Sequence, residues 1–273
     1  MSDAVVRPQE IRAKGAVVRP QEIRAEDAVV GPQEIRAEGA VLWPQEIDAV
    51  YVILHPVKEK ERHDRLIPHL IERGVPREKI KVVAAYWGDE LTSELIFKVY
   101  DPFLKRPCAT FTFKGRSLTR GEISLGLNFY FAMRAAIDEG TKKVITLESD
   151  VFLREDFVLR LRDLLADLGG REWDYVSLGE GVGTRPTGAD QSMYAGTKAY
   201  QPPHQLVYRC TDSMMFQTEY LKKVAGTFLP FREIIDWEMN FQNLVHQGKS
   251  LWADPPLVEQ GTCYGRILTS LPA

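Results

Sequence analysis

The chain of 273 residues contains only three cysteines, Cys108, Cys210 and Cys263, and they lie far apart in the sequence. A sparse, odd set of this kind argues against a disulfide framework, and it is typical of proteins that fold in a reducing compartment. No group of Cys and His residues has the spacing of a zinc site. We therefore expect a cytoplasmic protein, long enough to bury a sizeable core.

Long hydrophobic runs are also missing. No window approaches the roughly 20 apolar residues that cross a bilayer, and the N-terminus has no apolar segment of the signal-peptide type. The net charge is only -3, from 35 basic and 38 acidic residues, so the overall charge gives no reason to expect nucleic acid as a partner. We expect a protein without a membrane span and without a nucleic-acid ligand.

A twelve-residue repeat fills the N-terminal part of the chain, with similar units that begin at residues 4, 16, 28 and 40. Each unit places a proline before Gln-Glu-Ile, which would start one helical turn and break it before the next. Because the units carry few large apolar residues, we interpret residues 1–46 as a flexible tandem-repeat leader, with a small packed cap or an oligomerisation element as the alternative. Trp43 makes the last unit more apolar and should tie it to the following domain.

Residues 47–273 are interpreted as a single domain in which strands and helices alternate. Apolar, β-branched runs predict strands at residues 49–54, 80–86, 144–147, 173–178 and 250–253. Helical patterns occupy residues 58–73, 91–99, 155–168, 218–225 and 233–246. This alternation is typical of an α/β fold with a mostly parallel sheet flanked by helices. Residues 179–203, which lack periodicity, predict a long loop of the kind that serves as a lid.

A further long helix precedes the strand at residues 144–147, and its first residues form a recognisable signal. Thr119 and Glu122 have the spacing of a capping box, in which each side chain bonds the backbone N–H of the other residue. Gly140 ends this helix just before the strand. The capping role and a role in ligand binding are compatible, so both are kept open for Glu122.

The strand at residues 144–147 runs directly into two acidic residues, Glu148 and Asp150, with one small residue between them. The carboxyl ends of strands are where ligands bind in an open α/β sheet. Two carboxylates at alternate positions can hold one divalent cation, because oxygen ligands suit magnesium and manganese. From these residues alone, a solvated strand end that also caps the next helix is the alternative.

Several of these segments, taken in order, resemble the family 25 glycosyltransferases, which include bacterial lipopolysaccharide sugar transferases and collagen galactosyltransferase domains. The best pieces are Leu-Thr-Arg-Gly-Glu-Ile-Ser at residues 118–124 and Val-Ile-Thr-Leu-Glu-Ser-Asp-Val at residues 144–151. Blocks at residues 173–179, 235–237 and 255–260 are similar as well. The similarity covers nearly all of the chain from about residue 48 onward.

The resemblance implies a GT-A type, Rossmann-like fold and an inverting transfer of a hexose, galactose or glucose, from a UDP-sugar. The acceptor would be a hydroxyl on a glycan, a lipid-linked glycan or a protein. Glu148 and Asp150 would bind the Mn²⁺ or Mg²⁺ ion that stabilises the diphosphate leaving group. A base must also deprotonate the acceptor hydroxyl. Asp236 is the first candidate and Glu238 the second, although Asp236 could equally be a helix N-cap only.

The same resemblance places the donor at the ends of the first two strands, and the expected donor-binding residues are Val52, Ile53, Leu54, Ala85, Arg120 and Glu122. The chain departs from the family pattern at residues 54–57, at Asn128 and Phe129, and at Ser149, where relatives usually carry another acid. A relative that binds a nucleotide sugar or a partner without turnover is therefore the alternative function. A nucleotidyltransferase would need a Gly-rich phosphate loop after the first strand, and none is present.

Overall fold

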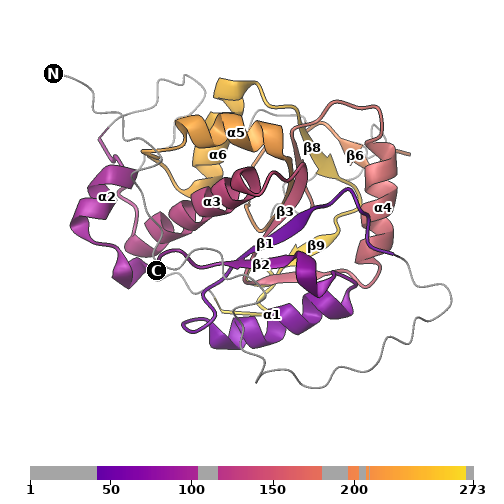
Figure 1. Ribbon diagram of the computed structural model, residues 1–273, viewed down its shortest axis with the longest axis horizontal. Coiled ribbons are helices and arrows are strands. Elements are labelled where there is room, and N and C mark those ends of the chain that lie inside the picture. Colours follow the sequence, from indigo (N-terminus) through magenta and orange to yellow (C-terminus); the bar gives the residue numbers. More distant parts are fainter. Residues whose placement is uncertain (1–41, 104–115, 180–195, 203–206, 209, 269–273) are drawn as a thin grey trace.

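A computed structural model describes residues 42–103, 116–179, 196–202, 207–208 and 210–268. A seven-stranded sheet forms the centre, and helices cover both of its faces (Figure 1). The strands are β1 (Ala49–Ile53), β2 (Ile80–Val83), β3 (Lys143–Glu148), β5 (Tyr175–Ser177), β6 (Ala199–Tyr200), β7 (Ser213–Gln217) and β8 (Ser250–Ala253). A separate two-stranded sheet pairs β4 (Val151–Leu153) with β9 (Val258–Gln260).

The helices lie close to where the sequence pattern placed them. They are α1 (Lys60–Glu72), α2 (Ser93–Val99), α3 (Arg120–Asp138), α4 (Phe157–Asp167), α5 (Thr218–Thr227) and α6 (Ile235–His246), with short 3-10 turns η4 (Arg77–Lys79) and η5 (Gly88–Glu90). The predicted long helix is α3, and its capping box is confirmed at Thr119 and Glu122. Pro68 lies inside α1. No helix in the described ranges has the length and apolar character that crossing a bilayer requires.

The sheet is mixed, so the expectation of a mostly parallel sheet is only partly confirmed. Its strand order is β2-β1-β3-β7-β5-β8-β6. The first three strands run parallel, and β8 is parallel to β5. Strand β7 is antiparallel to both β3 and β5, and β6 is antiparallel to β8. The Met-Met-Phe run inside β7 is buried, but its apolar pattern carries no information about strand direction.

Alternate residues of β1 enter two hydrophobic cores. Tyr51 and Ile53 pack on the side of α3, α5 and α6, whereas Val50 and Val52 pack on the side of α1 and α4. This alternation is the two-residue period of a strand that is buried on both faces. It fixes the direction in which each residue near the end of β1 points.

The described residues begin within the last repeat unit. Trp43 is buried, its indole N–H donates to the Ile47 carbonyl oxygen at 3.3 Å, and its ring lies 6.5 Å from that of Phe157 in α4. The predicted link between this unit and the domain is therefore present. Residues 1–41 of the predicted leader, and residues 180–195 and 203 of the predicted lid loop, lie outside the described residues.

Candidate functional site

A cavity of about 380 Å³ lies where the parallel strands β1, β2 and β3 end. The first residues of α3 close one side, because Arg120 and Gly121 reach the cavity. Gly88 of η5 packs so closely on this helix start that a Cβ there would lie 3.2 Å from the Arg120 carbonyl carbon. The cavity therefore occupies the strand edge at which an open α/β sheet binds ligands.

One end of the cavity, the acid end, holds Glu148 and Asp150. Glu148 is the last residue of β3, and β3 pairs it with Ile53 of β1. Its Oε1 accepts a hydrogen bond from Thr211 Oγ1 at 2.7 Å, and Asp150 Oδ2 accepts one from Thr262 Oγ1 at 2.5 Å. Asp150 is only 4% exposed, and its second oxygen, Oδ1, is buried without a hydrogen-bond partner among the described residues.

The acid end concentrates negative charge. Burial raises the pKa of the Glu148 carboxyl to about 8, and the nearby carboxylates of Asp150, Asp212 and Asp236 add to this increase. The hydrogen bond from Thr211 acts in the opposite direction but does not offset it. Because like charges in a buried place disfavour ionisation, the arrangement would be stabilised by a cation.

The acid end matches the way a hard cation is held when part of its coordination comes from substrate. Magnesium commonly takes only one or two carboxylates from the protein, with the remaining positions filled by water and phosphate oxygens. Within the described ranges, no three His, Cys, Asp or Glu side chains converge in a way that could hold a metal ion. Glu148 and Asp150 would therefore be the protein's share, and the Asp150 Oδ1, which has no hydrogen-bond partner among the described residues, would be available as an oxygen ligand.

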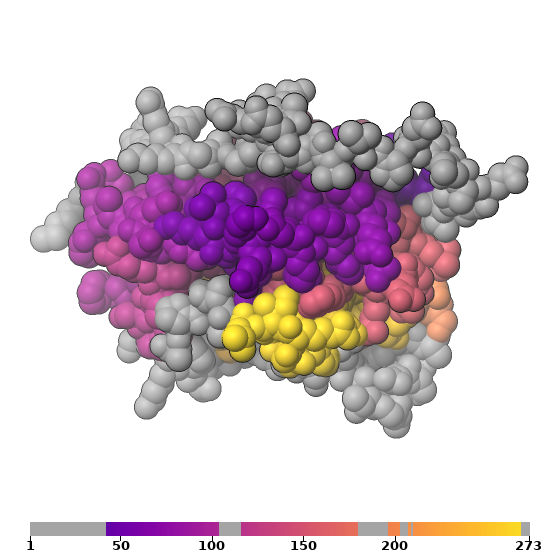
Figure 2. Space-filling model, turned by 90° about the horizontal axis from the view of Figure 1, so that it is seen from below, coloured from indigo at the N-terminus to yellow at the C-terminus, as the bar shows by residue number. Residues whose placement is uncertain are grey.

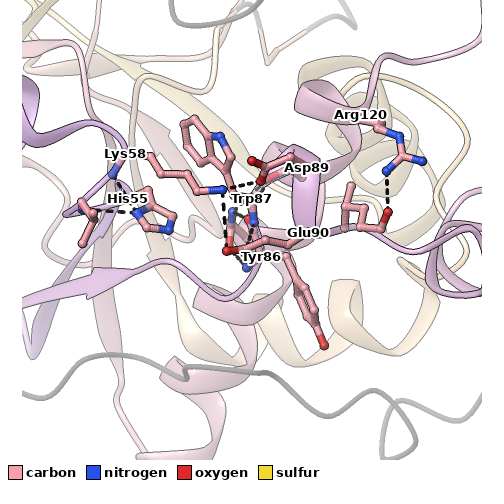
Figure 3. A network of polar contacts seen from close by, with 11 residues as sticks. His55, Lys58, Tyr86, Trp87, Asp89, Glu90 and Arg120 are labelled. Carbon is pink, nitrogen blue, oxygen red and sulfur yellow. Dashed lines mark hydrogen bonds and ion pairs between the residues drawn. The ribbon is translucent and has the colours of Figure 1, made fainter.

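The other end of the cavity, the aromatic end, is formed by His55 and Trp87 after β1 and β2. Their rings meet edge to face, with centroids 5.4 Å apart. Figure 3 shows Lys58 reaching across to the η5 turn, where it forms ion pairs with Asp89 and, at 3.7 Å, with Glu90. The Lys58 Nζ also lies 6.0 Å from the centroid of the Trp87 ring. This end offers flat apolar surface with charge at its edge.

Asn128 of α3 holds the backbone that carries Trp87. Its Oδ1 accepts from the Ala85 N–H at 2.8 Å, and its Nδ2 donates to the Tyr86 carbonyl oxygen at 2.8 Å. Ser124, one turn earlier, donates to the same carbonyl at 2.7 Å. Asn128 was noted in the sequence only as a departure from the family pattern, yet it lines the cavity and satisfies buried backbone groups.

The six residues expected to bind the donor divide evenly by position. Ile53, Leu54 and Arg120 line the cavity, although Arg120 Nη1 already donates to the Leu91 carbonyl oxygen at 2.6 Å (Figure 3). Val52 and Ala85 are buried in the hydrophobic cores and are not among the residues that line it. Ala84 takes the place expected for Ala85.

Glu122, the last of these donor candidates, is occupied by structural contacts. Its Oε2 accepts from the Thr119 N–H at 2.8 Å, which completes the capping box. Arg116 binds both carboxylate oxygens, at 2.9 and 2.5 Å, and these bonds lower the pKa of Glu122. Glu122 does not line the cavity, so the capping role is the one for which contacts are present.

The two candidates for the catalytic base occupy different surroundings. Asp236 lies in the first turn of α6 and outside the cavity lining, but its charge is among those that raise the pKa of Glu148. Glu238 is fully buried, with its oxygens accepting from the Arg232 N–H at 3.0 Å and from Gln242 Nε2 at 2.9 Å. Asp236 therefore acts electrostatically on Glu148, whereas the Glu238 carboxylate is engaged in the core.

Sequence reasoning missed the residues that complete the acid end. Thr211 and Thr262 each bond one carboxylate, although they lie 63 and 112 positions from their partners. Asp212 is buried beside Gly179, where a Cβ would lie 2.3 Å from Asp212 Oδ2. None of these residues belongs to a motif that the sequence displays, since only the fold brings them together.

Comparison with known proteins supports the resemblance to family 25. No family model matches the chain. Procollagen galactosyltransferase 2 is similar to it, with 26% identity in Mus musculus and 27% in Homo sapiens over 132 residues, which is 45% of this chain and 19% of each relative. A protein named probable inactive glycosyltransferase 25 family member 3 from Rattus norvegicus is 28% identical over 129 residues, or 46% of this chain and 22% of that protein.

These curated relatives are members of glycosyltransferase family 25, so the resemblance seen in the motifs is confirmed, at modest identity and over less than half of the chain. The matched segment spans about a fifth of the length of these relatives.

Proposed function

We propose that this chain is a metal-dependent, inverting glycosyltransferase that moves galactose or glucose from a UDP-sugar to a hydroxyl group of a glycan, a lipid-linked glycan or a protein. The observation that carries the proposal is a single cavity with a paired-carboxylate end and an aromatic end. A nucleotide sugar has the matching parts, since its diphosphate suits a cation held by acids and its base suits a flat aromatic surface. The named activity of the procollagen galactosyltransferase relatives supports the same class of reaction.

The chain's residues would divide the work along the cavity. The Glu148 and Asp150 carboxylates hold the cation, Mn²⁺ or Mg²⁺, with Thr211 and Thr262 orienting them through their hydroxyl groups. When bound, the cation acts as a Lewis acid and stabilises the negative charge of the departing diphosphate. His55 and Trp87 bind the uracil base of the donor, while Ile53 and Leu54 form the wall between the two ends.

Deprotonation of the acceptor hydroxyl is assigned to Asp236. Inversion requires the acceptor to attack from the face opposite the leaving group, with a base within hydrogen-bonding distance of its hydroxyl proton. The raised pKa of Glu148 supports this choice, because the charge of Asp236 contributes to it. Glu238 has both carboxylate oxygens engaged in the core, which disfavours it for this role.

The test is turnover of UDP-galactose and UDP-glucose, measured as hydrolysis or transfer with and without Mn²⁺. We expect Mn²⁺-stimulated release of UDP from the wild-type chain and its loss in Glu148→Ala/Asp150→Ala. A control variant, Glu94→Ala, removes an exposed acid of α2 and should behave like the wild type. If the double variant binds nucleotide and Mn²⁺ as the wild type does, the metal assignment is wrong.

A second candidate function, nucleotide-sugar binding without turnover, is supported by the names of some relatives. The family members named inactive are 27–28% identical to this chain, and the galactosyltransferases are 24–27% identical. Identity thus does not separate the two groups. A chain that binds UDP-galactose in a calorimetric titration but releases no UDP over many hours would favour this second function.

A further inference from the structure

The turn that carries the acid end is bound by one face of α1. Glu148, Ser149 and Asp150 join β3 to β4, and a turn with two like charges has little reason to keep one shape by itself. Figure 2 shows the underside of the molecule, with the purple surface of the N-terminal part of the domain beside the yellow C-terminal residues. Helix α1 reaches the turn from this side.

Arg65 makes the closest attachment. Its Nη2 donates to the Ser149 carbonyl oxygen at 2.8 Å and its Nη1 donates to the Val151 carbonyl oxygen at 2.9 Å. The two bonds come from one planar group, so they fix the direction of the backbone on both sides of Asp150. The guanidinium also lies 4.3 Å from the ring centroid of Phe152. This stacking limits its rotation.

The charge of Arg65 supports the same role. Burial lowers the pKa of its guanidinium, whereas Asp150 raises it. The Asp150 carboxylate thus has the positive charge of the Arg65 guanidinium near it, yet its Oδ1 makes no hydrogen bond in the described structure. Arg65 therefore holds the backbone and leaves the carboxylate oxygen available to a ligand.

A second α1 arginine engages the residue between the two acids. Arg62 Nη1 donates to Ser149 Oγ at 2.7 Å, and Ser149 Oγ in turn donates to Glu59 Oε1 at 2.9 Å. Arg62 also donates to the Leu268 carbonyl oxygen. The Ser149 hydroxyl is therefore occupied by Arg62 and Glu59 and anchors the turn at the start of α1. The carboxylates of Glu148 and Asp150, on either side of it, are the groups that would bind the cation.

We propose that Arg65 is a positioning residue for the cation site: its two bonds to the backbone at Ser149 and Val151 hold the Glu148 and Asp150 carboxylates on one cavity wall. This inference rests on the proposed function, because it concerns the same cation. Residues that orient metal ligands commonly change metal affinity or activity by about 10–100-fold when they are replaced.

The decisive variant is Arg65→Lys, which keeps the positive charge but cannot donate two parallel bonds to separate carbonyl groups. Arg65→Met, which keeps an unbranched side chain but removes the guanidinium, is the second variant if the first folds poorly. Asp64→Asn is the matched control, since it alters the neighbouring residue of α1 and an exposed ion pair with Lys60. All variants should have melting temperatures within a few degrees of each other before they are compared.

Three readouts separate positioning from general loss of structure. Titration with Mn²⁺, followed by the electron paramagnetic resonance signal of the free ion, should show affinity at least about tenfold weaker for Arg65→Lys than for Asp64→Asn. Amide exchange in the metal-free protein should become faster in β4 and its partner β9 but not in β1. In turnover, the apparent KM for Mn²⁺ should rise while kcat at saturating Mn²⁺ changes less than about threefold.

The outcomes distinguish this inference from the proposed function. If the wild type binds Mn²⁺ and Arg65→Lys binds it equally well, Arg65 does not position the site and the proposed function stands. If Arg65→Lys loses kcat at saturating Mn²⁺ without weaker Mn²⁺ binding, the positioning role is also overturned. If the wild type binds no Mn²⁺ at all, the proposed metal dependence is wrong, and the proposed role of Arg65 is wrong with it.

Discussion

The two ends of the cavity are built in different ways. At the acid end, Asp150 is 4% exposed and the surrounding bonds come from Thr262, Arg65 and the neighbouring backbone. At the aromatic end, Lys58 pairs with Asp89 and Glu90, whose side chains are 71% and 46% exposed. Buried polar bonds resist displacement by water, whereas exposed ion pairs contribute little and are screened by salt. The acid end is therefore fixed throughout, whereas the aromatic end combines a backbone held by buried bonds from Asn128 and Ser124 with exposed ion pairs at its edge that can adjust to a ligand.

This difference matches the two tasks proposed for the cavity, which are cation binding at the acid end and donor recognition at the aromatic end. A cation between two carboxylates needs a geometry that is set before the ligand arrives, because misplaced ligands weaken both binding and charge stabilisation. A nucleobase that stacks on an aromatic ring tolerates small shifts of that ring. Changes at the acid end should consequently reduce kcat or cation affinity, while changes at the aromatic end should mainly raise the KM for the donor.

The largest effect on turnover is expected for Asp236→Asn. This substitution removes the proposed base, which would link the acid end to the acceptor hydroxyl. Loss of the base should lower kcat by about 10²–10⁴-fold and leave Mn²⁺ binding nearly unchanged. Glu238→Gln is the control, since it disturbs a buried hydrogen-bonding network. It should lower the melting temperature, and the kcat of the folded variant should change little. A folded Glu238→Gln chain that loses turnover while Asp236→Asn retains it would reverse the assignment.

Asn128→Ala tests whether the aromatic end depends on a buried support. The Ala85 N–H and the Tyr86 carbonyl would lose their bonds to this side chain, at a cost of about 1–3 kcal/mol in the free energy of unfolding. Chemical denaturation measures this change. A neutral Asn128→Ala would show that this support is dispensable.

Trp87→Ala sharpens the proposed division between the ends. Stacking of a nucleobase on an aromatic side chain is worth about 1–3 kcal/mol, so the KM for the UDP-sugar should rise by about fivefold or more, with kcat largely retained. Trp87→Phe keeps an aromatic face and should restore most of the affinity. Steady-state kinetics with varied donor concentration decides the matter, and a fall in kcat at constant KM would contradict the assignment.

The smallest effect is expected for Lys58→Ala. Its partners Asp89 and Glu90 are exposed, so the KM for the donor should change by less than about fivefold. The remaining difference between Lys58→Ala and wild type should shrink as salt is raised, because the ion pairs are screened. A large effect that persists at high salt would mean that Lys58 contacts the donor directly.

The sequence predicted one half of the sheet better than the other. Strands β1, β2 and β3 and the long helix α3 follow from apolar runs and from the capping box at Thr119. In the other half, β7 is inserted antiparallel between β3 and β5, which strand composition cannot reveal. Local patterns report burial and periodicity, while strand order depends on contacts between distant segments.

The candidate site divides in the same way. The sequence alone determined the acidic pair Glu148 and Asp150, because both lie next to one strand and carry the chemistry themselves. Only the tertiary structure decided which groups surround them: Arg65 from α1, and Thr211 and Thr262 from segments 63 and 112 positions away from their partners. The physical reason is that a carboxylate's position depends on the backbone and hydrogen bonds around it, and these come from elements that only folding brings together.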